Sequence, residues 1–242
     1  MSVGLVFVSH SALIASGLVQ LAGQMAPNVS LVPAGGTDDD GIGTSFDKVT
    51  RALAQADSGD GVVILCDLGS AILTAETALD FLDDAQRTSV RIIDAPLVEG
   101  GVAAAVAAQT GADLDGVEAA ARSAVDVFVA SSSPTRNRDA DRESAAPAGL
   151  TDETATEGGY SRSVTIINRD GLHARPAADF VKLASTFDTP VTVNGRDAKS
   201  LLAIMALGLQ KGKVAEIATA DPRGRDAVDA LADLVESGFG EA

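Results

Sequence analysis

Val3-Gly4-Leu5-Val6-Phe7-Val8-Ser9-His10-Ser11 is a short apolar run that ends in polar residues. Three comparable apolar runs follow, and longer segments with helical periodicity separate them. Continuous apolar strands that alternate with helices are typical of a parallel sheet covered on both faces. The sequence therefore predicts an open, mostly parallel α/β domain over residues 1–130.

Polar or glycine-bearing segments follow each expected strand of this domain. Ligands of open parallel sheets bind outside the carboxyl ends of the strands. The segments expected at that edge are Ser9–Ser11, Ala34–Thr37, Asp67–Ser70 and Ala95–Gly100. The expected strands are Val3–Ser9, Val29–Pro33, Gly61–Cys66 and Val90–Ile93, and the expected helices are Ala12–Met25, Phe46–Gln55, Ala71–Leu82 and Val102–Thr110.

Residues 131–160 contain almost no large apolar side chains and are rich in Ser, Ala, Thr, Gly, Pro and charge. Such a stretch cannot bury enough surface to offset its ordering entropy, which predicts a flexible linker. The remaining residues, 161–242, mix an Asn194-Gly195 hairpin turn with helical patterns, which predicts an antiparallel α/β sandwich. Its expected strands are Ser163–Ile167, Val191–Val193 and Glu216–Thr219, and its expected helices are Pro176–Phe187, Leu201–Leu209 and Ala227–Glu236.

The composition excludes several classes of function. The net charge is −16, and most of the acidic excess lies in residues 1–130, so binding to nucleic acid is not expected. No apolar run approaches the length of a membrane span, and we expect a soluble cytoplasmic protein without membrane insertion. The single Cys66 fits a reducing compartment.

His10 is one of two histidines in the chain, and it follows the first strand. Asp67 follows another strand, so both side chains are expected at the same edge of the sheet. A carboxylate bonded to one ring nitrogen fixes the tautomer and leaves the other nitrogen as a nucleophile. A hydrolase could use the same pair, but no serine lies in a Gly-x-Ser-x-Gly elbow, and Cys66 in an apolar strand is a poor nucleophile. The alternative is an ordinary strand-end histidine.

His173 is the second histidine, and it lies in the segment Gly171-Leu172-His173-Ala174-Arg175-Pro176-Ala177. Pro176 suits the first turn of a helix, so the imidazole is expected at a helix start. Helix N-termini favour dianionic groups, and Arg175 can add a charge-assisted bond to phosphate. The alternative is a surface histidine in a loop. Two histidines and one cysteine leave few ligands for zinc, so no metal site is expected.

Residues 161–242 resemble the phosphocarrier HPr of the phosphoenolpyruvate-dependent phosphotransferase system. The motifs that carry the resemblance are the His173 segment and Lys199-Ser200-Leu201-Leu202-Ala203-Ile204-Met205-Ala206-Leu207-Gly208. The resemblance implies an HPr-like open-faced sandwich in which His173 accepts a phosphoryl group from enzyme I through Nδ1 and Arg175 neutralises it. Ser200 is expected to cap the following helix. In some HPr proteins the matching serine is also a regulatory phosphorylation site.

Residues 1–130 resemble the enzyme IIA-like domain of the DhaM family, the phosphoryl-donor subunits of bacterial dihydroxyacetone kinases, which share the fold of mannose-type enzyme IIA. One departure is Thr74, where many relatives are expected to carry Asn. The motifs that carry the resemblance are Val8–Ser11, Gly41–Ser45, Asp67–Ala71 and Ala95–Gly100.

Together the resemblances imply a phosphotransferase subunit that works through phosphohistidines. His173 would pass phosphate to His10, which would phosphorylate ADP held by the nucleotide-binding subunit DhaL, for transfer to dihydroxyacetone on DhaK. Asp67 would orient His10, while Ser70, Gly69 and Thr44 are weaker candidates for contacts to phosphate oxygens.

The same resemblances set expectations about partners. The chain is expected to bind no cofactor, because magnesium and ADP belong to its partners. It is also expected to form a homodimer through the first domain. One alternative is an enzyme IIA–HPr fusion that serves a mannose-type sugar permease. Another is a regulatory phosphoprotein.

Overall fold

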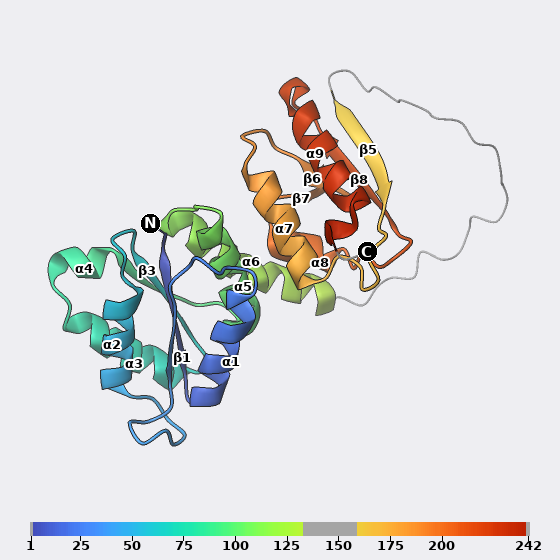
Figure 1. Cartoon of the computed structure of the whole chain (residues 1–242). Helices are drawn as coiled ribbons and strands as arrows, with labels where there is room; N and C mark the ends of the chain where they lie inside the picture. Colours follow the sequence, from blue (N-terminus) through green and yellow to red (C-terminus); the bar gives the residue numbers. More distant parts are fainter. Residues whose placement is uncertain (1, 133–158, 241–242) are drawn as a thin grey trace, which may run out of the picture.

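The computed structural model describes residues 2–132 and 159–240, which form two α/β domains (Figure 1). Most of the predicted linker, residues 131–160, lies outside the described residues. Its first two residues, 131 and 132, still belong to a helix, and Tyr160 opens a strand, so these ends of the prediction are wrong.

Strands and helices alternate along the first domain, as its apolar pattern predicts. The elements are β1 (Gly4–Ser9), α1 (Ala12–Gly23), β2 (Leu31–Gly35), α2 (Phe46–Ala56), β3 (Val62–Cys66), α3 (Gly69–Asp80), α4 (Asp84–Thr88), β4 (Val90–Ile93), α5 (Leu97–Gln109) and α6 (Leu114–Ser132).

The four strands of the first domain form a parallel sheet in the order β2-β1-β3-β4. The central strand β1 is buried along its whole length, and its side chains alternate between two cores. Leu5 and Phe7 pack with α1, α5 and α6, whereas Val6 and Val8 pack with α2 and α3. The predicted parallel sheet with helices on both faces is confirmed.

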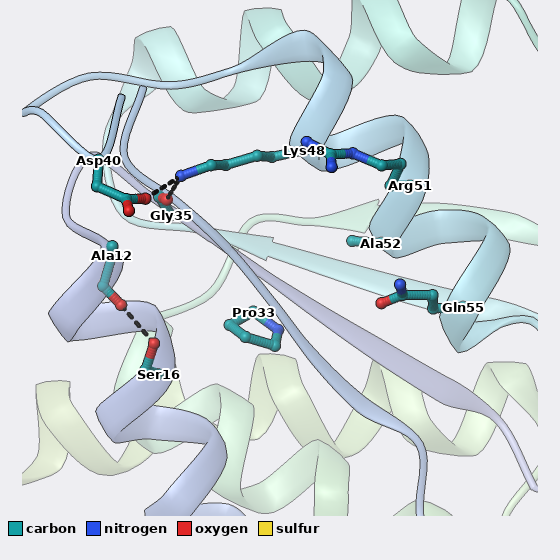
Figure 2. Close-up of a pocket in the computed structure, with 9 residues that line it drawn as sticks. All are labelled: Ala12, Ser16, Pro33, Gly35, Asp40, Lys48, Arg51, Ala52 and Gln55. Carbon is teal, nitrogen blue, oxygen red and sulfur yellow. Dashed lines mark hydrogen bonds and ion pairs between the residues drawn. The ribbon is translucent and has the colours of Figure 1, made fainter. Parts of the chain in front are cut away.

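The outer edge of β2 is protected against pairing with a further strand. Figure 2 shows this edge at the floor of a pocket between α1 and α2. Pro33 has no N–H to donate, and Lys48 Nζ donates to the carbonyl of Gly35 (3.1 Å) and pairs with Asp40 (2.6 Å). A proline and a lysine on an edge strand are ordinary means of ending a sheet.

In the first domain two helix starts differ from the sequence prediction, and in the second domain the helices Ala174–Ser185 and Arg225–Glu236 each begin two residues earlier than predicted. Helix α5 begins at Leu97 rather than Val102, and α3 begins at Gly69 rather than Ala71; both early turns contain glycine, which as a residue type favours loops. Gly101 instead serves close packing: a Cβ there would lie 2.8 Å from the Phe7 ring. Helices α4 and α6 were not predicted at all.

The second domain has an antiparallel sheet in the order β5-β8-β6-β7. Buried and exposed residues alternate along β8, which leaves one face of the sheet uncovered and confirms the open-faced sandwich. The predicted helix Leu201–Leu209 ends earlier because Gly208 takes a positive φ of 56°. The elements are β5 (Tyr160–Thr165), α7 (Ala174–Ser185), β6 (Thr192–Val193), β7 (Arg196–Asp197), α8 (Leu201–Ala206), β8 (Val214–Thr219) and α9 (Arg225–Glu236).

No helix in the described parts of the chain has the length and apolar character needed to cross a membrane.

Two helical glycines of the first domain should respond oppositely to the same substitution. Gly101→Ala should lower the free energy of unfolding by about 1–2 kcal/mol, because overpacking against Phe7 outweighs the gain in helix propensity. Gly17→Ala should raise it by about 0.5–1 kcal/mol, because a Cβ at this position of α1 would meet no neighbouring element within 4 Å. Urea unfolding followed by circular dichroism measures both. Equal effects of the two substitutions would contradict the packing of α5 on β1.

Candidate functional site

His10 and Asp67 meet at the carboxyl edge of the parallel sheet. His10 directly follows β1, and Asp67 directly follows β3, its neighbour in the sheet. The Asp67 N–H donates to the carbonyl of Val8 (3.1 Å), which aligns the two strand ends. The structure therefore brings together the pair that the sequence predicted from two strand ends.

Asp67 contacts His10 twice. One carboxylate oxygen bonds to the imidazole of His10, and the other bonds to the backbone of His10. His10 Nδ1 lies 2.9 Å from Asp67 Oδ1, and the His10 backbone N–H donates to Oδ2 (2.8 Å). Partial burial pushes the pKa of Asp67 upward, but the bonds from His10 and Ser9 outweigh it and hold that pKa below its ordinary value. Asp67 is therefore ionised at neutral pH and keeps a proton on Nδ1, which leaves the lone pair of Nε2 as the nucleophile.

Ser70 lies at the nucleophilic nitrogen. Its Oγ is 2.6 Å from His10 Nε2, and the residue is exposed in the first turn of α3. Leu68, the residue before this helix, makes no side-chain cap, so the N–H groups of Gly69 and Ser70 stand at a helix N-terminus. Such a terminus favours an anion, and these two residues are placed to meet a phosphoryl group on Nε2.

Thr44 is linked to His10 only indirectly, through Thr74 and Ser70. Its hydroxyl bonds to that of Thr74 (2.8 Å), which in turn donates to the Ser70 carbonyl (3.1 Å). The loop that carries Thr44 is joined to the site by the Gly43 N–H, which donates to the His10 carbonyl (2.9 Å). Thr44 and Thr74 thus support the turn of Ser70, and the structure shows no bond from Thr44 to the His10 ring.

Ser9 was expected at this edge of the sheet, but the sequence analysis assigned no role to its side chain. It is fully buried, and its Oγ donates to Asp67 Oδ2 (2.8 Å) while accepting from the Ser11 N–H (3.1 Å). Its hydroxyl therefore helps to place the carboxylate that places the imidazole. The available signal was a polar residue at the end of a strand that is otherwise wholly apolar.

Exposed apolar side chains lie near the residues of the His10 site along the chain. Leu13, Ile42, Leu68 and Leu73 are each more than half exposed, and they adjoin, along the chain, residues that contact His10 or its partners. Large exposed apolar side chains gathered around polar groups are typical of surfaces that bind another protein.

His173 stands at the N-terminus of α7, as predicted. It is exposed in an extended conformation, and its carbonyl accepts from the Ala177 N–H (2.9 Å). Gly171 shapes the loop before it, because its φ is +70° and a Cβ there would lie 2.4 Å from the carbonyl oxygen of Leu209. Arg175 is exposed in the first turn of α7, two residues after His173 in the chain. A phosphoryl group on His173 would meet both the helix terminus and this guanidinium.

Ser200 caps α8, as its position predicts. Its Oγ accepts from the Ala203 N–H (3.3 Å), and the residue is half-buried. Cys66, at the end of β3, has its pKa raised to about 12, first by burial and then by nearby carboxylates. A thiol with that pKa stays protonated at neutral pH, so Cys66 offers no thiolate beside the His10 site.

Among the described residues, no three or more His, Cys, Asp and Glu side chains gather where they could hold a metal ion. The groups placed to receive a ligand at His10 and His173 are a hydroxyl, backbone N–H groups and a guanidinium, all of which suit an anion. Both sites therefore offer an imidazole beside groups that suit an anion.

Two protein families match the two domains. The model described as "PTS system fructose IIA component" matches residues 4–118. The model described as "PTS HPr component phosphorylation site" matches residues 160–237. Their order along the chain is the order of the two domains in the structure.

Some curated relatives match one domain of this chain, and others match both domains together. The phosphoryl donor subunit DhaM of the PEP-dependent dihydroxyacetone kinase of Escherichia coli (strain K12) is 36% identical over 99% of this chain and 51% of its own length. A DhaM of Listeria innocua is 42% identical over 43% of this chain and 84% of its own length. The phosphocarrier HPr of Vibrio cholerae is 44% identical over 32% of this chain and 95% of its own length.

The chain spans about half the length of the relatives that match it throughout, including those of Providencia stuartii and Pantoea ananatis. It covers most of the shorter DhaM of Listeria innocua, and its second domain covers nearly all of a free-standing HPr. The chain therefore belongs to the DhaM family of phosphoryl donor subunits, with an HPr domain joined after its enzyme IIA-like domain.

Proposed function

We propose that this chain relays a phosphoryl group from phosphoenolpyruvate, through enzyme I, to His173 and then to His10. From His10 the group passes to ADP bound in the nucleotide subunit DhaL, and then to dihydroxyacetone bound in DhaK. The observation that carries the proposal is the His10 ring, whose Nδ1 is bonded to an ionised Asp67 while Nε2 faces the exposed Ser70.

The transfer between the two imidazoles balances without a cofactor. The lone pair of His10 Nε2 attacks phosphorus, an Nε2–P bond forms, and the Nδ1–P bond of phospho-His173 breaks. The electrons of that bond return to His173 as a lone pair, and each ring keeps its N–H proton. The His10 ring becomes cationic as it accepts the group, and Asp67, 2.9 Å from Nδ1, stabilises that charge.

Partner proteins supply the remaining chemistry in this proposal. The apolar side chains around His10, which include Leu13 and Ile42, favour recognition of a protein surface rather than of a small polar substrate. Magnesium and ADP would accompany the partner, and the chain itself would need no cofactor. Homodimerisation through the first domain and a cytoplasmic location belong to the same proposal.

The order of the relay is the first prediction of this proposal. With phosphoenolpyruvate, magnesium and enzyme I, His10→Ala should still be labelled at His173, whereas His173→Ala should be labelled at neither histidine. The reason is that enzyme I recognises the HPr domain and His10 receives its phosphate from His173. Mass spectrometry under alkaline handling, which preserves phosphohistidine, locates the group. Labelling of His10 in His173→Ala would refute the relay.

Asp67 should increase the rate of phosphoryl transfer to His10 by fixing the tautomer of the His10 ring. Asp67→Asn should slow transfer from His173 to His10 by about 10- to 100-fold, since a hydrogen bond to a charged group contributes about 1.5–3 kcal/mol. Ser9→Ala should slow it less, by about fivefold, because the carboxylate keeps its other donors. Rapid-quench measurement of phospho-His10 gives these rates.

The matched control is Asp80→Asn, which removes an exposed carboxylate paired with Arg87 on the same domain. It should leave the transfer rate unchanged. If Asp67→Asn transfers as fast as Asp80→Asn, the proposed role of the carboxylate is wrong.

The identity of the final acceptor has its own test. Phosphorylated chain should yield dihydroxyacetone phosphate when DhaL, ADP, DhaK and dihydroxyacetone are supplied together. It should leave a mannose-type enzyme IIB domain unlabelled. The reverse result would favour a sugar-transport fusion, and phosphorylation of the chain without any product from either system would favour a regulatory phosphoprotein.

A further inference from the structure

The two domains touch where α5 and α6 of the first meet α7 and α8 of the second. Leu202 is only 6% exposed, and it packs against Ala103 of α5 and Ala124 of α6, with Ala120 at the margin. Its neighbours Leu201 and Ile204 instead belong to a larger buried cluster that contains core residues of both domains. Leu202 therefore points out of its own domain and is buried by the other.

The surface that receives Leu202 consists of small side chains. Helix α5 carries buried Gly, Ala and Val residues around most of its circumference, so the sheet alone does not cover it. A helix that is apolar on all sides is expected to be covered on all sides. We call the face formed by Ala103, Ala107, Ala120 and Ala124 the alanine face.

The fit between the domains is incomplete. A cavity of about 340 Å³ remains between the alanine face and α8, with Val106, Ser123, Lys199 and Ser200 among its lining residues. Protein cores contain few voids larger than a water molecule, whereas contacts between domains of one chain resemble transient interfaces. The interface between the domains therefore keeps an unfilled cavity beside its buried contacts.

The contact keeps the second domain away from the edge that carries His10. Helix α5 begins at Leu97, beside that edge, and Ala103 and Ala107 lie about 9 and 15 Å farther along its axis, at 1.5 Å per residue. Figure 1 shows the loop that follows β2, which adjoins His10, at the far end of the first domain from α7 and α8. Direct transfer from His173 to His10 requires the two rings to face one another.

We propose that the alanine face is a docking surface for α8 of the chain's own HPr domain, and that docking holds His173 in a resting position from which it does not reach His10. This inference rests on the proposed relay. Transfer then requires release of the HPr domain. At about 3.3–3.6 Å per residue, the segment 133–158 is long enough to let it travel to the His10 edge after release.

Two variants break the contact from opposite sides. Leu202→Asp puts a charge on α8, and Ala120→Glu puts one on α6, where the half-buried position accepts a helix-forming residue. The matched control is Val214→Asp, which places the same charge at an exposed position of β8 on the second domain. Because the two variants lie in different domains, a folding defect in one leaves the other as a test.

Two measurements on the full chain report the result. Small-angle X-ray scattering should show a larger radius of gyration for Leu202→Asp and for Ala120→Glu, and no change for Val214→Asp. With excess enzyme I, rapid quench should show phospho-His10 forming faster in both variants. A resting form favoured tenfold over the released form would give a rise of up to about tenfold.

Three outcomes would overturn the inference. An unchanged radius of gyration in both variants would show that the contact is not populated. Slower formation of phospho-His10, with normal labelling of His173, would show that the docked form is the productive one. Conversion of a dimer to a monomer by Ala120→Glu, seen by light scattering, would show that a second copy covers the alanine face.

Failure of the relay would look different. If wild-type His10 is never labelled while the scattering of both variants still expands, the proposed relay is wrong and the docking surface stands. The small-angle scattering measurement needs no phosphate and therefore tests only the contact between the two domains.

Discussion

The carboxylate of Asp67 is the group on which the His10 site depends. It accepts from the Ser9 hydroxyl, from the His10 backbone and from the His10 ring, and so joins the ends of β1 and β3. The parallel pairing of these strands brings all of these groups to one edge. The first turn of α3 and the loop carrying Thr44 are then built around the ring that Asp67 has oriented. Without that carboxylate, either ring nitrogen could carry the proton.

The two histidines stand in opposite electrostatic surroundings. His10 adjoins an ionised carboxylate, which stabilises a cationic ring, and Ser70 with a helix N-terminus faces its free nitrogen. His173 adjoins Arg175 at the start of α7, where positive groups suit a dianionic phosphoryl group. In the proposed relay, Asp67 would stabilise the cationic His10 ring, and the helix N-terminus at each site would stabilise the phosphoryl group.

Much of the first domain could be predicted because its signals are local. The apolar run that ends at His10 and the strand that ends before Asp67 each indicate a position at one sheet edge, and their neighbouring strands bring them together. The starts of α3 and α5 were missed because glycine favours loops, whereas Gly101 is needed to let α5 approach Phe7. The role of Ser9 was missed because it depends on Asp67, which is distant in sequence.

The sequence by itself determined the α/β class of both domains, the two histidines, the Asp67 partner and the position of His173 at a helix start. These follow from the spacing of apolar residues and from capping chemistry, which act over a few residues. Only the tertiary structure decided that Ser9 places Asp67, that Thr44 supports Ser70 rather than touching His10, and that Leu202 leaves its own domain to pack on Ala103 and Ala124. Those contacts join residues far apart along the chain, and their pairing depends on how whole elements pack rather than on any local pattern.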